Sequence, residues 1–189
     1  RDTDRSRGLG DVYKRQEPSA QEVELPAFKG ATHEMGFGDL IEEAKAAQHF
    51  EARVNVNDDR FLAPDSMIDE IRLACFETGQ DIPTTIGELM RCMYLSLSTC
   101  YAESIEEMVS LTGRTYTSIN IVGGGCQDSY LNELTTKACG IPVFAGPVEG
   151  TSLGNLIVQM IADDQIEDLQ AARDMIRVSF DIDMVNPQE

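Results

Sequence analysis

The sequence is poor in positive charge and lacks several features that mark other classes of protein. It contains no tryptophan and two histidines, and 15 lysines and arginines stand against 33 aspartates and glutamates, a net charge of −18. The absence of a basic stripe argues against nucleic acid and anionic membranes as partners. No run of about 18 apolar residues is present, which excludes a transmembrane helix, and no apolar segment marks a secretory signal. An anionic ligand would have to be held by local backbone N–H groups or a metal ion.

Cysteine and histidine are too few and too scattered for a structural zinc site, so we predict no metal-binding residues in this chain. An odd number of cysteines without a signal segment indicates a reducing, cytoplasmic setting. Cys75 and Cys92 flank a helix break and could face each other across it as a disulfide; two buried thiols are the favoured alternative. The cysteines are Cys75, Cys92, Cys100, Cys126 and Cys139, and the histidines are His33 and His49.

The first sixteen residues do not match the rest of the chain. They hold five basic and three acidic residues, and we interpret residues 1–16 as a non-native leader, with a native flexible leader as the alternative. We expect the natural N-terminus to be missing. Residues 17–37 carry prolines and glycines without periodicity and are predicted to be loop. Residues 38–180 form the predicted domain, and residues 181–189 a loose tail.

Hydrophobic residues make up 42% of the sequence, enough for a core, and their spacing predicts the elements of that domain. The longest predicted helix begins at Thr84 or Thr85 and carries an apolar stripe from Ile86 to Val109, which we interpret as core. Short β-branched or apolar runs predict two strands. The predicted helices lie at residues 37–50, 66–79, 85–113, 127–138, 151–161 and 166–179, and the strands at 117–122 and 141–146.

This order predicts an α/β fold, helix-rich with a short parallel sheet. The two strands are joined through one helix, which makes them parallel. Parallel strands need cover on both faces and are seldom found in pairs alone. We therefore expect the domain to be incomplete at its N-terminal side, with further strands in preceding sequence.

A run of three glycines, Gly123–Gly125, ends the first predicted strand and is the most informative local feature. Glycines at a strand end let a ligand approach the backbone closely, and ligands of open α/β sheets lie at this edge. A second set, Gly146, Gly150 and Gly154, follows the other strand. A dinucleotide fingerprint would need glycine where Asp128 stands, and no Walker A loop exists. Two such turns predict a cleft for a nucleotide-sized ligand; Cys126 as a nucleophile paired with a histidine is a weak alternative.

The segment INIVGGGCQDSYLNELTTKACGIPV (Ile119–Val143), followed by AGPVEGTSLGN, resembles the C-terminal, nucleotide-binding domain of the FGGY carbohydrate kinases. NDDRFLAPDSM, ETGQDIP and ELMRCMYLSL are similar to members that act on L-rhamnulose, and the resemblance covers about residues 38–180. It implies a partial actin-like, ribonuclease-H-like ATPase domain on one side of a cleft. It also implies transfer of phosphate from ATP, with Mg²⁺, to the 1-hydroxyl of the ketose L-rhamnulose in rhamnose catabolism.

The resemblance assigns nucleotide-binding positions residue by residue. Gly124 matches the glycine that contacts ATP, and Gly123 and Gly125 line the same turn. Asp128 stands where the family often has asparagine facing adenine, and Gly150 where alanine is usual. The general base and most sugar contacts of the family belong to the N-terminal domain, so we predict no catalytic residue here and an inactive chain.

Three acidic residues near one another, Asp58, Asp59 and Asp65, are interpreted as turn and capping residues and not as catalytic acids. Two other functions stay open at this stage. One is a non-catalytic nucleotide-binding or regulatory module of the same fold. The other is a structural acidic α/β module whose glycine turns bind nothing.

Overall fold

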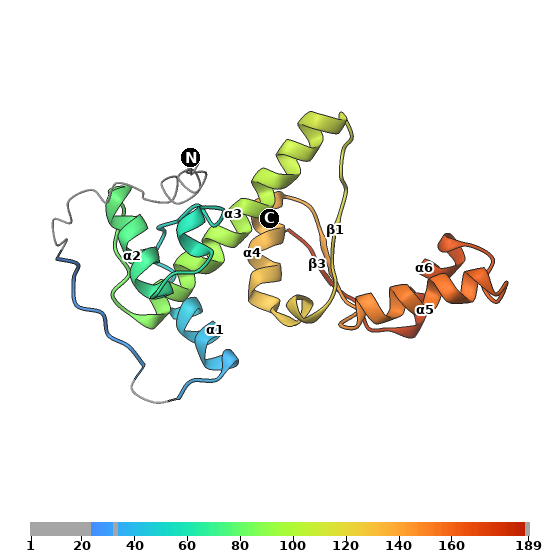
Figure 1. The fold of residues 1–189 in the computed structure, drawn as a ribbon, viewed down its shortest axis with the longest axis horizontal. Coiled ribbons are helices and arrows are strands. Elements are labelled where there is room, and N and C mark those ends of the chain that lie inside the picture. Colours follow the sequence, from blue (N-terminus) through green and yellow to red (C-terminus); the bar gives the residue numbers. More distant parts are fainter. Residues whose placement is uncertain (1–23, 32–33, 188–189) are drawn as a thin grey trace, which may run out of the picture.

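A computed structural model describes residues 24–31 and 34–187, so the predicted leader, residues 17–23 of the predicted loop and His33 lie outside the described residues. Every helix and strand that the sequence predicts within this part is present (Figure 1). The helices are α1 (Phe37–Ala46), α2 (Met67–Glu77), α3 (Ile86–Thr112), α4 (Ser129–Cys139), α5 (Gly150–Ala162) and α6 (Leu169–Ser179). The strands are β1 (Ile119–Ile121), β2 (Val143–Ala145) and β3 (Asp183–Val185), and short 3₁₀ helices cover Asp59–Phe61 (η1) and Gly124–Gln127 (η2).

The sheet is mixed, in the order β1-β2-β3. β1 and β2 are parallel, as predicted, with Ile119 opposite Val143. The sequence did not predict β3, which lies in the tail expected to be loose and pairs antiparallel with the other side of β2. Its sequence, Asp-Met-Val, is too short to show a strand pattern. Its order comes from the backbone of β2 and from Thr136, whose hydroxyl donates to Val185 O at 3.3 Å.

Helix α3 is the centre of the fold and begins with a capping box. The Thr85 hydroxyl accepts from the Glu88 N–H, and the Glu88 carboxylate accepts from the backbone of Thr84 and Thr85. The helix ends at Gly113, whose left-handed conformation (φ 65°) is one that glycine adopts without strain. Helices α1 and α4 both pack on α3, so this one helix links the elements on either side.

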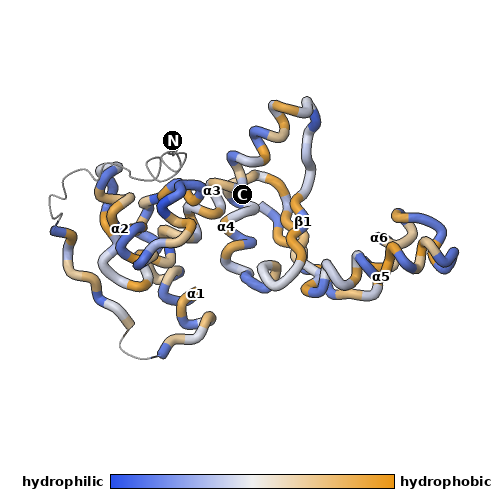
Figure 2. The backbone as a smooth tube through the Cα atoms, in the orientation of Figure 1, coloured by the Kyte–Doolittle hydropathy of each residue, from blue (hydrophilic) through white to orange (hydrophobic). Residues whose placement is uncertain are grey.

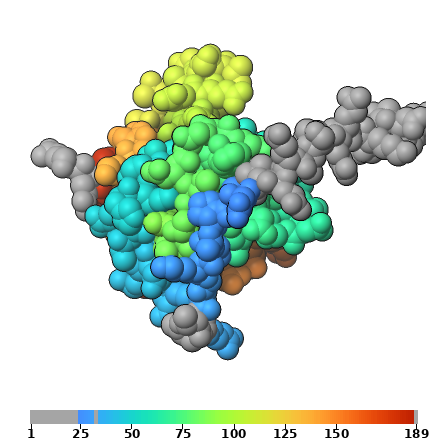
Figure 3. Space-filling model, turned by 90° about the vertical axis from the view of Figure 1, so that its left-hand side faces the viewer, coloured from blue at the N-terminus to red at the C-terminus, as the bar shows by residue number. Residues whose placement is uncertain are grey.

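Only the first half of the α3 stripe is core. Leu89 and Tyr94 are buried, whereas Met108 and Val109 expose 43% and 39% of their surface. The prediction that the whole stripe is core is therefore wrong for its second half. That half extends past the other helices and projects from the molecule (Figure 3). Within the described part of the chain β1 pairs only with β2, so its outer edge is open as well.

The apolar residues gather in three separate clusters. The first joins α2 to α3 and contains Cys75 and Cys92, the second joins α1, α3 and α4, and the third lies inside the α5–α6 pair. Figure 1 shows α5 and α6 as an arm that extends away from the other helices. Figure 2 shows hydrophobic stretches along this arm. Two of its apolar side chains, Leu156 and Val158, are exposed.

Cys75 and Cys92 do face each other, as their spacing predicts. Their Sγ atoms lie 3.9 Å apart, both side chains are fully buried, and both are free thiols, so the disulfide alternative is not what the structure contains. The hydrogen bond with Cys75, together with burial, raises the pKa of the Cys92 thiol. The pair thus behaves as part of the core between α2 and α3.

Candidate functional site

The two glycine turns lie side by side at the carboxyl ends of β1 and β2. Gly146 N–H donates to Ile121 O at 2.8 Å, and Gly123 N–H donates to Pro147 O at 3.1 Å. Each turn therefore hydrogen-bonds to the strand end or loop of the other. The structure brings together the two segments that the sequence could only place at the same edge of a sheet.

The glycines of this site divide into two kinds. A Cβ atom on Gly150 would lie 2.9 Å from Val122 Cβ, so this glycine is required where α5 meets the end of β1. Gly123 has a φ of 81°, a conformation that side chains rarely adopt. Gly124 and Gly125, in contrast, are exposed, and a Cβ on either would meet no atom of the described chain within 4 Å. Their backbone is open to a ligand.

The amino terminus of α5 adjoins this open backbone through the contact between Gly150 and Val122. Its N-cap, Glu149, makes no side-chain hydrogen bond to the helix. The first N–H groups of α5 therefore keep their capacity to bind an anion, which the helix dipole favours. Gly154, predicted to mark a close approach of backbone or ligand, is exposed with no atom of the described chain within 4 Å of its Cβ position, so no other backbone approaches it there.

Asp128 lies behind the glycine turn, with 7% of its surface exposed. One carboxylate oxygen accepts from Leu131 N–H at 3.0 Å and caps α4, and the other accepts from the Tyr94 hydroxyl at 2.8 Å. Both oxygens are thus used inside the protein, on the side away from the open face. Sequence reasoning missed Tyr94, whose only signal was its place in the buried stripe of α3.

The remaining candidates do not form a second site. Cys126 is buried, and its carbonyl accepts from Asn132 Nδ2 at 2.9 Å, while His49 contacts Glu88 on α3. Cys126 is therefore not paired with His49, and the other histidine, His33, lies outside the described residues. Asp58 caps η1 by accepting from Arg60 N–H, in agreement with a capping role.

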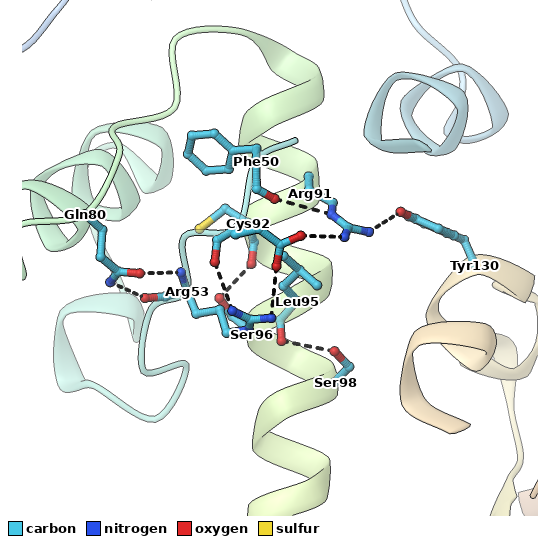
Figure 4. A network of polar contacts seen from close by, with 10 residues as sticks. Phe50, Arg53, Gln80, Arg91, Cys92, Leu95, Ser96, Ser98 and Tyr130 are labelled. Atoms are coloured by element: carbon cyan, nitrogen blue, oxygen red, sulfur yellow. Dashed lines mark hydrogen bonds and ion pairs between the residues drawn. The ribbon is translucent and has the colours of Figure 1, made fainter. Parts of the chain in front are cut away.

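Arg91 organises the polar contacts around the first half of α3 (Figure 4). Its guanidinium donates to the carbonyl of Phe50 and to the Tyr130 hydroxyl, and pairs with Glu51. A cavity lies beside this network, but none of the glycine turns lines it. The network supports the contact between α3 and α4 and not the open face of the turns.

Among residues 24–31 and 34–187, no group of three or more His, Cys, Asp or Glu side chains is arranged to hold a metal ion. Over the same residues, no helix has both the length and the apolar character needed to cross a membrane.

Comparison with known proteins identifies the family of this chain. Residues 13–162 match the C-terminal domain of the FGGY family of carbohydrate kinases. The chain is 42% identical over 153 residues to rhamnulokinase from Bacillus subtilis (strain 168), an alignment that covers 81% of this chain and 32% of that protein. The chain thus spans about a third of the length of this relative. It belongs to the FGGY family of carbohydrate kinases, of which it contains the C-terminal domain, with a sequence like that of rhamnulokinase.

Proposed function

We propose that this chain forms one wall of the ATP site of a cytoplasmic sugar kinase that converts L-rhamnulose to L-rhamnulose 1-phosphate. The observation that carries the proposal is the pair of adjoining glycine turns, which leave open backbone next to the amino terminus of α5. The similarity to a rhamnulokinase supports the choice of sugar. The ketose contacts would come from the rest of such a kinase, which makes the remaining polypeptide the principal partner of this chain.

The turns suit a nucleotide for physical reasons. Gly124 and Gly125 present backbone without side chains, so the adenosine or phosphate groups can lie directly on them. Gly123 and Gly150 hold the two turns together and keep that surface continuous. Asp128 supports the turn from behind through the start of α4 and does not contact the nucleotide.

Phosphoryl transfer depends mainly on positioning and on neutralisation of the phosphate charge. A chain with a net charge of −18 repels free ATP, and its described residues hold no ligand set for a metal of their own. We therefore propose that the nucleotide enters as its Mg²⁺ complex, in which the cation offsets the phosphate charge. No carboxylate in this chain is assigned as general base, and the chain alone is proposed to be inactive.

The sugar assignment is tested with the kinase that contains this domain. ADP formation is measured with L-rhamnulose and, in parallel, with L-fuculose, D-xylulose and glycerol. A preference for L-rhamnulose supports the proposal, and a preference for another sugar overturns it. The 189-residue chain, assayed alone, is expected to form no sugar phosphate; detectable product refutes that part. Nucleotide binding without phosphorylation by the whole protein would instead identify a regulatory module.

The role of the glycine turn in nucleotide binding is tested separately by measuring ADP binding after the substitution Gly124→Val in the kinase that contains this domain. The position has open space and an ordinary backbone conformation, so the substitution leaves the fold intact while blocking ligand approach. Gly38→Ala, also without neighbours within 4 Å but on α1, is the matched control. Loss of ADP binding in Gly124→Val alone supports the proposal. Equal ADP affinity in both variants refutes it.

A further inference from the structure

The inner side of the glycine turn is fixed by a set of hydrogen bonds. Cys126 N–H donates to Gly123 O at 3.1 Å, and Asp128 N–H donates to Gly125 O at 3.3 Å. Asn132 Nδ2 donates to the carbonyl of Cys126 from one turn into α4. The residues of the turn that are open to a ligand on one side are hydrogen-bonded to the protein on the other. The conformation of the turn that a ligand would meet therefore depends on how the start of α4 is held.

That start is held from α3 by the contact between Tyr94 and Asp128. Both side chains are buried, and a hydroxyl that donates to a carboxylate forms a stronger bond than one between neutral groups. Burial and the bond to Asp128 raise the pKa of Tyr94, which keeps the hydroxyl protonated as the donor. The two residues are 34 positions apart in sequence, so this contact ties a distant helix to the turn.

The Tyr94 ring is itself immobilised. It packs edge-on against Tyr130, with ring centroids 5.1 Å apart and an interplanar angle of 73°. Tyr130 in turn accepts a hydrogen bond from Arg91, one turn earlier on α3 (Figure 4). Tyr130 lies in the same cluster as Tyr94, but its hydroxyl is bound to Arg91 and not to Asp128. Removing the Tyr130 hydroxyl is therefore a matched control for removing that of Tyr94.

We propose that Tyr94 is a positioning residue for the nucleotide site: through Asp128, its hydroxyl fixes the conformation of the glycine turn without touching the nucleotide. This inference rests on the proposed function. It also accounts for aspartate at position 128. Asparagine caps a helix about as well as aspartate, but only the carboxylate offers a charged acceptor to Tyr94 while it caps α4.

Hydrogen exchange of the full 189-residue chain tests the inference without any ligand. Tyr94→Phe removes one hydroxyl and retains the ring, and Asp128→Asn retains the cap but weakens the bond to Tyr94. We expect the amides of Cys126 and Asp128, which donate to Gly123 O and Gly125 O within the turn, to exchange about tenfold faster in Tyr94→Phe, the effect of losing one hydrogen bond to a charged group. Asp128→Asn should be intermediate, and Tyr130→Phe should leave these amides unchanged. Equal exchange in Tyr94→Phe and Tyr130→Phe overturns the inference.

ADP titration of the kinase that contains this domain, carrying the same substitutions and held at a temperature where circular dichroism shows each variant to be folded, separates positioning from stability. We expect Tyr94→Phe to weaken ADP binding about tenfold, and the double variant with Asp128→Asn to bind no more weakly than Tyr94→Phe, because the two groups act as one. Unchanged affinity in Tyr94→Phe, despite faster exchange, overturns the positioning role. If the unsubstituted kinase binds no ADP while the exchange difference holds, the proposed function fails and the constraint on the turn stands.

Discussion

Gly150 and Val122 are in such close contact that a single added methyl group would place two Cβ atoms 2.9 Å apart. Real side chains do not approach so closely, and a Cβ cannot move without its backbone. The contact is what joins the first turn of α5 to the end of β1.

We predict that Gly150→Ala lowers the free energy of unfolding by about 1–3 kcal/mol, the usual effect of overpacking. Gly154→Ala is the matched control, because it lies one turn along α5 with open space around its Cβ position. It should stabilise the helix by about 1 kcal/mol or less. Urea unfolding of the two variants checks this, and a stable Gly150→Ala would show that Val122 gives way.

The hydrogen bonds of Glu88 lead us to expect that the free energy of unfolding falls in acid. Burial acts against its ionisation, but hydrogen bonds from Thr84, His49 and Thr85 outweigh burial and lower the pKa of the carboxyl. Because the folded pKa lies below the unfolded value, the contribution is fully present above the unfolded pKa and is lost as pH falls through the folded one.

We expect Glu88→Ala to cost about 1–2 kcal/mol at pH 7, through loss of the capping box of α3, and less at pH 3. Urea unfolding at both values of pH measures the difference. Glu103→Ala, on an exposed part of the same helix, serves as the control. A pH-independent effect of Glu88→Ala would contradict the prediction.

From the contact between Cys75 and Cys92 we expect oxidation to give one specific disulfide. Cys75 and Cys92 are buried with their Sγ atoms in contact, so a strong oxidant should join them to each other and not to Cys100. A disulfide closing a loop of this length stabilises a protein by about 3 kcal/mol. Peptide mass spectrometry and thermal unfolding, before and after oxidation, check both parts. Cys92→Ala should abolish the product and the stabilisation; a cross-link to Cys100 would contradict the assigned pairing.

Because the second half of α3 exposes apolar side chains, we expect the isolated chain to self-associate. Met108 and Leu111 present apolar surface that no described residue covers, and such patches bring chains together. Met108→Gln combined with Leu111→Gln should keep the chain monomeric at concentrations where the unsubstituted chain associates. Sedimentation velocity measures this, with Glu107→Gln as the control. Identical sedimentation of all three proteins would rule out this surface as the contact.

Local signals predicted the elements well because their causes lie within a few residues. Ser66 and Thr85 cap α2 and α3, and Gly140 ends α4 in the left-handed conformation. β3 was not predicted, because three residues are too few to show an alternation of apolar and polar side chains. Pairing with β2 orders them. The α3 stripe was interpreted as core throughout because periodicity shows which face is apolar but not what lies against it.

In the candidate site, too, the features with local causes were predicted and those that depend on distant residues were not. Spacing placed both glycine turns at one sheet edge, and the family resemblance chose Gly124 within them. The direction of the Asp128 side chain was not predictable, since an N-cap near a ligand can turn outward or inward. The Tyr94 hydroxyl, on a helix far away in sequence, decides that it turns inward. Which glycines tolerate a side chain likewise depends on neighbours such as Val122 that only the fold reveals.

The open outer edge of β1 has a practical consequence. A row of backbone donors and acceptors is available there, since in the described part of the chain β1 pairs with β2 alone. Such an edge accepts another strand by main-chain hydrogen bonds, whether or not that strand is covalently joined. A kinase of this family cut ahead of this domain would thus be suited to reassembly from two separately expressed polypeptides, and restored enzyme activity would then report that the halves had met.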